Sequence, residues 1–213
     1  MRVVLAIGAH PDDIELGCAG TLALHKAKGD RVYLLILTRG EASGRPKSER
    51  ARAEIREKEC RESAKILNSN DIFFGGFKDT MVQDGRETVD VIEDVLRQVG
   101  PDIVYAPSCK DTHQDHRKTG HAALSACRRV KIVLLYEGAS TQRDFYPQVF
   151  VDIKQSFKTK LRAIRVFGSQ IDSQNGGFAK AVKAIEGLAK YRGYQAGVEV
   201  AEAFEVGKFV FEL

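Results

Sequence analysis

Two short clusters of titratable side chains stand out in the sequence, far apart along the chain. The first, His10 with Asp12 and Asp13, directly follows the apolar run 3–7. The second covers residues 111–116, which include two histidines and two aspartates, and it also follows an apolar run. A buried strand needs only a polar stop, and Gly or Asn would supply one without crowding titratable groups together. The two clusters together therefore predict a divided metal site.

Each cluster also has an ordinary structural interpretation. His113 and His116 share one face if a helix begins there, and most such pairs lie on solvated helix surfaces. Asp12 and Asp13 are equally suited to N-capping a helix. However, both clusters follow predicted strands at the carboxyl end, where doubly wound sheets bind ligands. That shared position favours a metal site, and two imidazoles with a carboxylate and an open fourth position form a catalytic zinc set.

The turn at Pro11 bears on the two aspartates. A residue before proline is disfavoured in the helical region, so the chain is expected to turn sharply at His10. Asp12 and Asp13 should then point in different directions. One carboxylate can face a metal while the other faces a water.

Alternating strands and helices are expected to position these clusters. Strands are predicted at 2–8, 31–38, 72–74, 101–106 and 131–136, and helices at 17–28, 48–67, 87–99 and 119–129. Later in the chain, strands are predicted at 148–153 and 200–211, and helices at 154–167 and 178–192. This alternation predicts a doubly wound, Rossmann-like α/β fold, with a mostly parallel sheet covered by helices on both faces. Residues 1–213 are expected to form a single domain.

Composition excludes several classes of partner and compartment. The 33 basic and 29 acidic residues are interspersed and give a net charge of +4, so nucleic acid is not an expected partner. The 43% hydrophobic and 29% charged content predicts no membrane span. The polar residues 10–13 interrupt the N-terminal apolar run, so no signal peptide is expected. The four cysteines form no CxxC pair, which predicts reduced thiols in a cytoplasmic protein.

The two clusters resemble the signature motifs of a known family, the LmbE-like or PIG-L-like zinc-dependent N-deacetylases. The resemblance rests on Ala9-His10-Pro11-Asp12-Asp13 with Glu15, and on His113-Gln114-Asp115-His116-Arg117. Further matches extend over nearly the whole chain: Thr38-Arg39-Gly40-Glu41, Arg56 with Glu59, Asp79, Tyr136-Glu137, Phe150-Val151-Asp152-Ile153, Ser169-Gln170 and Ala201-Glu202-Ala203-Phe204. In one departure, Ile14 separates the aspartate pair from Glu15, which many members place directly after the pair.

The resemblance implies a metal centre and a mechanism. Zn²⁺ is expected to be held by His10, Asp13 and His116. Asp12 is expected to act as general base, and His113 as a catalytic histidine with Asp115 as its orienting partner. Zinc would lower the pKa of a water to about 7. Protonated His113, its pKa raised by Asp115, would share the stabilisation of the oxyanion, and either Asp12 or His113 would protonate the leaving amine.

The resemblance also implies a substrate class and an assembly. The expected substrate is a small N-acetylated sugar, from which the acetyl group of an N-acetylglucosamine moiety is removed, and a homo-oligomer is expected. Arg56 and Asp79 are expected to bind substrate, although a solvated salt bridge and an ordinary turn would equally account for them. Specificity is expected from the loops 39–48, 75–86 and 138–147.

Two other functions compete with this hypothesis. A metal-dependent phosphoryl-transfer or receiver-type protein could use the aspartate pair to hold magnesium. Three histidines suit zinc better, and the sequence has no GxxxxGK[ST] loop. A noncatalytic sugar- or nucleotide-binding module is the third hypothesis, but residues 8–17 lack the GxGxxG spacing.

Overall fold

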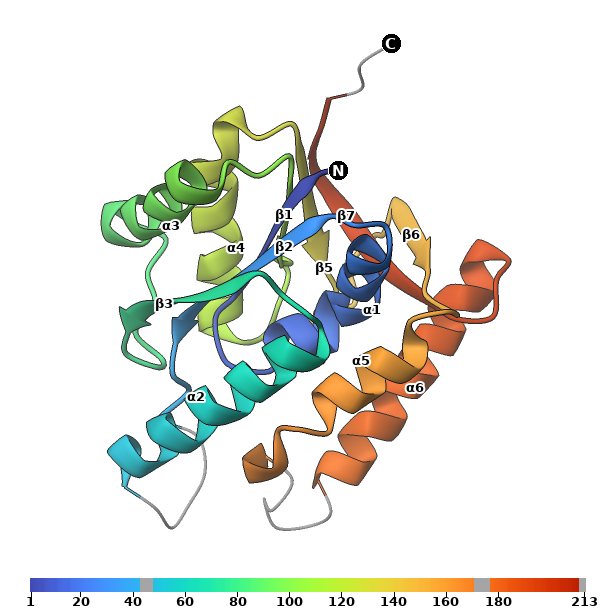
Figure 1. The fold of residues 1–213 in the computed structure, drawn as a ribbon, viewed down its shortest axis with the longest axis horizontal. Coiled ribbons are helices and arrows are strands. Elements are labelled where there is room, and N and C mark those ends of the chain that lie inside the picture. Colours follow the sequence, from blue (N-terminus) through green and yellow to red (C-terminus); the bar gives the residue numbers. More distant parts are fainter. Residues whose placement is uncertain (43–47, 171–176, 211–213) are drawn as a thin grey trace.

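The apolar runs form the strands of one sheet. The computed structural model describes residues 1–42, 48–170 and 177–210, and the strand order within them is β3-β2-β1-β4-β5-β7-β6 (Figure 1). The strands are β1 (Val3–Gly8), β2 (Arg31–Thr38), β3 (Asp71–Phe77), β4 (Ile103–Pro107), β5 (Ile132–Tyr136), β6 (Val149–Asp152) and β7 (Ala201–Phe209). Strands β1 to β5 pair in parallel, whereas β7 is antiparallel to both β5 and β6. The predicted mostly parallel α/β sheet is confirmed.

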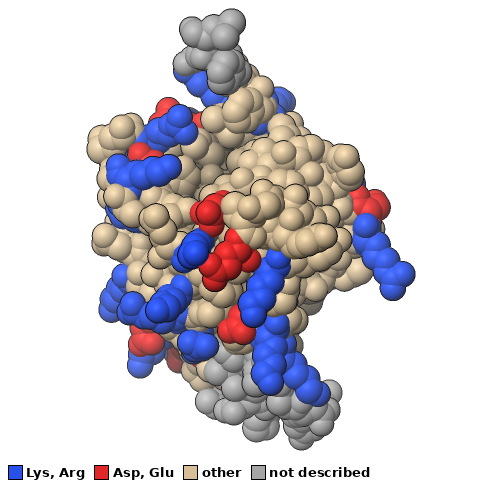
Figure 2. Space-filling model, turned by 90° about the vertical axis from the view of Figure 1, so that its right-hand side faces the viewer, with Lys and Arg blue, Asp and Glu red and all other residues tan. Residues whose placement is uncertain are grey.

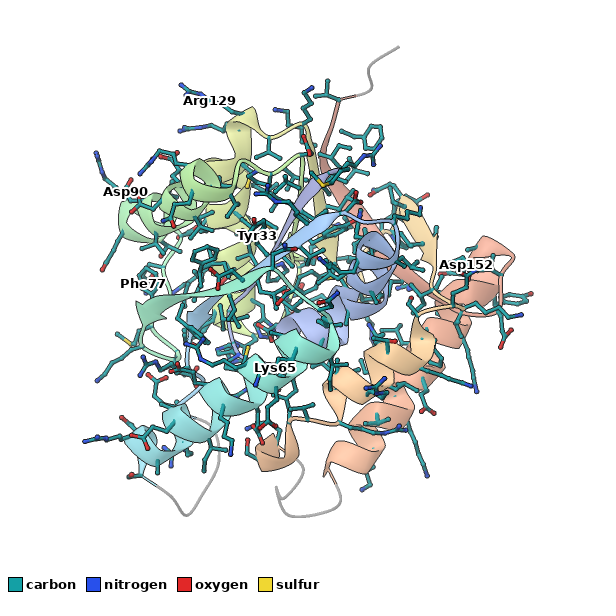
Figure 3. All side chains as sticks on the ribbon, viewed as in Figure 1. Tyr33, Lys65, Phe77, Asp90, Arg129 and Asp152 are labelled. Carbon is teal, nitrogen blue, oxygen red and sulfur yellow. The ribbon has the colours of Figure 1, made fainter. Side chains whose placement is uncertain are left out.

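Helices cover both faces of the sheet (Figure 1). They are α1 (Asp13–Ala27), α2 (Glu49–Ile66), α3 (Arg86–Val99), α4 (Gln114–Ala126), α5 (Phe157–Ile164) and α6 (Gly177–Ala196). Alternate side chains of β1 enter opposite layers: Leu5 joins the core cluster containing Ile92 of α3, and Val4 joins the cluster containing Ile14 of α1. Both layers are filled by side chains in Figure 3. No described helix has the length and apolarity that crossing a bilayer requires.

Many charged side chains lie at the surface, outside these layers. Asp90 on α3 and Arg129 after α4 are exposed and point away from the sheet in Figure 3. On the face shown in Figure 2, Lys and Arg residues lie among Asp and Glu residues. This mixture agrees with the interspersed charges of the sequence.

Two helices begin earlier than the sequence predicted. Helix α1 starts at Asp13 instead of residue 17, and α4 at Gln114 instead of residue 119. The polar side chains of these first turns mask the apolar periodicity on which the prediction depended. Strand β3 is also longer than the predicted 72–74, because its glycines Gly75 and Gly76 weaken the strand pattern. As a result, both polar clusters lie at helix N-termini.

The sheet has a switch point between β1 and β4. Strand β1 pairs with β2 on one side and with β4 on the other, so the connections leave in opposite directions. The crevice at the carboxyl ends of such neighbouring strands is the usual ligand site of doubly wound sheets. The N-termini of α1 and α4 follow β1 and β4 into this crevice.

A buried ion pair fixes the middle of α1. Lys160 Nζ lies 2.5 Å from Glu202 Oε1, and both side chains are almost fully buried. The Glu202 carboxylate accepts the backbone N–H groups of Gly20 (2.9 Å) and Thr21 (2.7 Å), and Lys160 donates to the Leu16 carbonyl (2.7 Å). Buried charges need such partners. These contacts tie α1 to α5 and β7.

Candidate active site

The first polar cluster forms the turn between β1 and α1. Asp12 has a left-handed backbone (φ 104°), an unusual conformation for a residue other than glycine. Such strain commonly persists where the side chain has a function. Asp12 occupies the N-cap position of α1, but its side chain makes no capping hydrogen bond. The N-capping interpretation is therefore wrong for Asp12.

Asp12 and Asp13 point in different directions, as the turn at Pro11 predicts. One Asp13 oxygen, Oδ2, accepts two backbone N–H groups of the preceding turn, at 2.9 and 2.8 Å. The other, Oδ1, lies 3.2 Å from His116 Nε2. Asp12 Oδ1 accepts a hydrogen bond from Arg56 Nη2 at 3.1 Å, and its side chain is 21% exposed. Asp13 therefore faces the histidines, while Asp12 lies at the accessible rim.

The three side chains expected to hold zinc converge from both clusters. His10 Nδ1 lies 3.1 Å from His116 Nε2. The Asp13 carboxylate places Oδ1 3.2 Å from His116 Nε2 and Oδ2 3.6 Å from His10 Nδ1. Tetrahedral zinc with bonds of about 2.0–2.2 Å holds its ligand atoms about 3.3–3.5 Å apart. The donor types fit a zinc ion, and nitrogen atoms of His10, His113 and His116 also lie within 4.8 Å of one another.

Carboxylates lie behind both histidines. His10 Nε2 lies 3.0 Å from Asp79 Oδ1 and 3.2 Å from Asp115 Oδ2. His116 Nδ1 lies 3.3 Å from Asp111 Oδ1. In metal sites, a carboxylate that accepts the outer N–H of a ligand imidazole fixes the ring and its tautomer. This arrangement leaves Nδ1 of His10 and Nε2 of His116 facing each other.

The carboxylates also determine the protonation of the histidines. Burial alone would lower the pKa of His116, but Asp13 and Asp111 raise it to about 10. Burial likewise opposes the charge on His10, yet Asp115, Asp13 and Asp79 together raise its pKa well above the ordinary value. The negative site therefore attracts either protons or a metal cation, and ligation by zinc would release these protons.

His113 lies at the N-cap of α4 and stacks on the ring of His116, with centroids 4.6 Å apart. Its Nδ1 accepts the backbone N–H of Asp115 at 3.2 Å, so the neutral ring carries its hydrogen on Nε2. Burial, together with His10 and His116, lowers the pKa of His113. Asp115 acts in the expected direction and raises the pKa of His113, but burial and the two neighbouring histidines outweigh it, and a protonated His113 stays a prediction.

Three other predicted residues lie at the site with contacts that differ from expectation. The Asp115 carboxylate does not orient His113: its Oδ2 faces His10 and accepts the Thr80 N–H at 2.7 Å. Asp79, expected at the substrate, is 8% exposed and directs its carboxylate to His10 and to the Ala42 N–H.

Arg56 is the third of these residues. It is 4% exposed, which excludes the solvated salt-bridge interpretation. Its guanidinium donates hydrogen bonds to Asp12 and to the carbonyls of Pro11 and Gly40. These partners all belong to the protein, and the expected contact with substrate stays a prediction. Arg56 thereby connects α2 to the turn that carries the aspartate pair.

Two residues that contact His116, Asp111 and Ser140, were not predicted from the sequence as site residues. Asp111 is 1% exposed, and Ser140 Oγ lies 3.3 Å from His116 Nδ1. The only sequence signal was that Asp111 opens the second cluster.

Glu15 is fully buried and accepts a hydrogen bond from Ser63 Oγ of α2 at 2.6 Å, while burial raises its pKa to about 7.

The loops predicted to set specificity are described only in part. Residues 43–47 of the 39–48 loop lie outside the described residues. In the 75–86 loop, Asp79 and Thr80 contact the site. In the 138–147 loop, Ser140 contacts it.

Comparison with known proteins identifies related sequences and structures. Residues 5–127 match the PIG-L family, described as GlcNAc-PI de-N-acetylase. The uncharacterized deacetylase YaiS of Escherichia coli is 35% identical over 169 residues, which cover 76% of this chain and 88% of that protein. Diacetylchitobiose deacetylase of Thermococcus kodakarensis is 33% identical over 193 residues, which cover 80% and 70% of the two chains.

A solved structure and a relative of different activity complete the comparison. The N,N'-diacetylchitobiose deacetylase from Pyrococcus horikoshii superimposes with a TM-score of 0.87 at 28% identity, over 96% of this chain and 83% of that one. A 4-oxalmesaconate hydratase of Pseudomonas putida is 26% identical over 196 residues, which cover 79% of this chain and 74% of that protein. By its sequence match and its fold, this chain belongs to the PIG-L family of LmbE-like deacetylases.

Proposed function

We propose that this protein is a zinc-dependent hydrolase that removes the acetyl group from an N-acetylglucosamine-type sugar or small conjugate. The observation that carries the proposal is the convergence of His10 Nδ1, His116 Nε2 and the Asp13 carboxylate within 3.1–3.6 Å, beside an accessible Asp12. Several relatives are named for deacetylation of acetylated amino sugars, which supports the substrate class. These relatives favour the deacetylase over the phosphoryl-transfer alternative.

His10, Asp13 and His116 are the residues that would hold zinc. When bound, zinc supplies a Lewis acid for the acetyl carbonyl and makes a nearby water more acidic. The protein contributes a rigid set of ligands, because Asp13 is anchored by two backbone N–H groups and both imidazoles are backed by carboxylates.

Asp12 is the proposed general base. It is next to a ligand in sequence, but its side chain is directed to Arg56 and to solvent. This position lets the carboxylate accept a proton from the attacking water without leaving its place. The contact with Arg56 also fixes the orientation of the carboxylate, which general-base catalysis requires.

His113 is the proposed hydrogen-bond donor to the developing oxyanion. Because Nδ1 accepts the Asp115 N–H, the neutral ring has Nε2–H available as a donor. A fixed donor of this kind stabilises the tetrahedral intermediate without having to be charged. A neutral donor has no proton to spare, so Asp12 passes the proton taken from water to the leaving amine.

Acetate release tests the proposal directly. The zinc-loaded protein is incubated with N-acetylglucosamine, N,N'-diacetylchitobiose and an N-acetylglucosaminyl malate conjugate, and acetate and free amine are both quantified. Equal amounts of the two products are expected. Phosphate esters and 4-oxalmesaconate serve as parallel substrates. Turnover confined to either of these, with every N-acetyl sugar left intact, would refute the deacetylase proposal.

A further inference from the structure

Asp111 lies behind His116, on the side away from the proposed zinc ligands' meeting point. Its Oδ1 lies 3.3 Å from His116 Nδ1 and accepts from Ser140 Oγ at 2.6 Å. The same oxygen accepts the His113 N–H at 2.8 Å, and Oδ2 accepts from Thr141 Oγ1 at 3.4 Å. Asp111 is 1% exposed, so this carboxylate is nearly removed from water.

The backbone around Asp111 holds this carboxylate in place. Asp111 forms an isolated antiparallel bridge with Thr141. On either side, the Thr112 N–H donates to the Ser140 carbonyl at 3.0 Å, and the Gln142 N–H donates to the Lys110 carbonyl at 2.8 Å. A short two-stranded ribbon therefore joins the end of β4 to the 138–142 segment. Ser140 and Asp111 are fixed relative to each other by this ribbon.

Packing by itself does not fix the His116 ring. One face of the ring stacks on His113. Beside it, a cavity of about 40 Å³ is lined by Asp13, Asp111, His116 and Ser140 among others. Because packing beside the ring is incomplete, the polar contacts at Nδ1 contribute to its orientation, together with the contacts of Nε2 with Asp13 and His10.

We propose that Asp111, seated by Ser140, is a positioning residue that fixes the His116 ring and its Nδ1–H tautomer, so that Nε2 is presented to the metal. This inference rests on the proposed function only in requiring that the chain binds zinc. A carboxylate acceptor at Nδ1 also makes the imidazole more basic and hence a better ligand. Asp111 thus couples the 138–142 segment to the metal centre.

Metal affinity tests this role without any substrate. Zinc affinity is measured by competition with a chelator for the wild type and for Asp111→Ala, Asp111→Asn and Ser140→Ala. Visible absorption of the cobalt-substituted proteins reports the ligand geometry. Asp144→Ala is the matched control. Asp144 is an exposed aspartate of the 138–147 loop, which also carries Ser140, but it lies outside the proposed site. Circular dichroism checks that each variant is folded.

Asp111→Ala is expected to weaken zinc binding by about 10- to 100-fold while the stoichiometry stays at one, and to shift the cobalt bands. Asp111→Asn, which keeps an acceptor but loses the charge, should fall between Asp111→Ala and the wild type. Ser140→Ala should cost about two- to tenfold. Asp144→Ala should match the wild type.

Wild-type affinity in folded Asp111→Ala, or an equal loss in Asp144→Ala, would overturn the positioning role and leave the proposed function intact. If Asp111→Ala does not fold, Ser140→Ala decides: unchanged affinity and cobalt bands there would reject the proposal. A wild-type protein that takes up no zinc would defeat the inference and the proposed zinc dependence together. Zinc binding without acetate release would defeat only the proposed reaction.

Discussion

Arg56 Nη2 lies 3.1 Å from Asp12 Oδ1, and the same guanidinium donates to the carbonyls of Pro11 and Gly40. One side chain of α2 thus holds the strained turn that carries the proposed base and a proposed ligand. Gly40 makes this approach possible: it has a φ of 64°, and a Cβ there would lie 2.2 Å from Arg56 Nη1.

Arg56→Ala is expected to lower the free energy of unfolding by about 2–4 kcal/mol, because it leaves Asp12 and two carbonyls without their donor. Turnover should also fall by about tenfold or more, because Arg56 would no longer hold the turn that positions Asp12. Arg56→Lys should recover only part of both, because an ammonium cannot reproduce the planar fork. Denaturant unfolding and acetate release measure the effects. Arg50 lies on the same helix and is 90% exposed. In the control variant Arg50→Ala, the free energy of unfolding should stay within about 0.5 kcal/mol of the wild-type value.

Substitutions of Asp12 and Asp13 are expected to impair the protein in different ways. Asp12→Asn keeps the shape of the side chain but cannot accept a proton, so zinc should stay bound while turnover falls by about two to four orders of magnitude. Asp13→Ala removes a charged ligand and should weaken zinc binding itself. Elemental analysis after dialysis and acetate-release assays separate the two. Near-normal turnover in Asp12→Asn, or loss of zinc equal to that of Asp13→Ala, contradicts this division.

Gly17 permits the contact between α1 and β5. A Cβ at Gly17 would lie 2.2 Å from the ring of Tyr136, whose hydroxyl donates to the Ile7 carbonyl at 2.9 Å. Gly17→Ala should therefore destabilise the protein by about 1–3 kcal/mol despite the better helix propensity of alanine. Gly187→Ala in α6 meets nothing within 4 Å and should be neutral or stabilise by up to about 1 kcal/mol. Thermal unfolding of the pair gives the comparison, and similar melting temperatures would refute the packing argument.

Lys160 is expected to be far more important to stability than other paired lysines. Lys160→Met leaves the buried Glu202 without its counter-charge and should cost about 3–5 kcal/mol. Lys154→Met breaks an exposed pair with Glu199 and should leave the denaturant midpoint almost unchanged. Denaturant midpoints of the two variants measure the difference. Equal costs would mean that the buried pair does not stabilise α1 as described.

The sequence was sufficient to predict the sheet and the meeting of the two clusters. Continuous apolar runs such as 3–7 and 132–136 can be buried on both faces only as central parallel strands, and alternation with helices restricts their order. Since β1 and β4 both end in polar clusters, their carboxyl ends had to bring His10 and His116 to one edge. The early starts of α1 and α4 escaped prediction because polar residues, including the proposed ligands Asp13 and His116, occupy their first turns.

Only the tertiary structure decided which carboxylate contacts which histidine. Asp115 is two residues from His113, and side chains at that spacing point to different sides of a helical turn. Its carboxylate therefore reaches His10, from the other cluster, at 3.2 Å. Asp79 and Asp111 likewise contact histidines from separate loops. Residue types and local spacing determined that a metal site could form, whereas contacts across the sheet edge depend on packing between distant segments, which local sequence patterns do not encode.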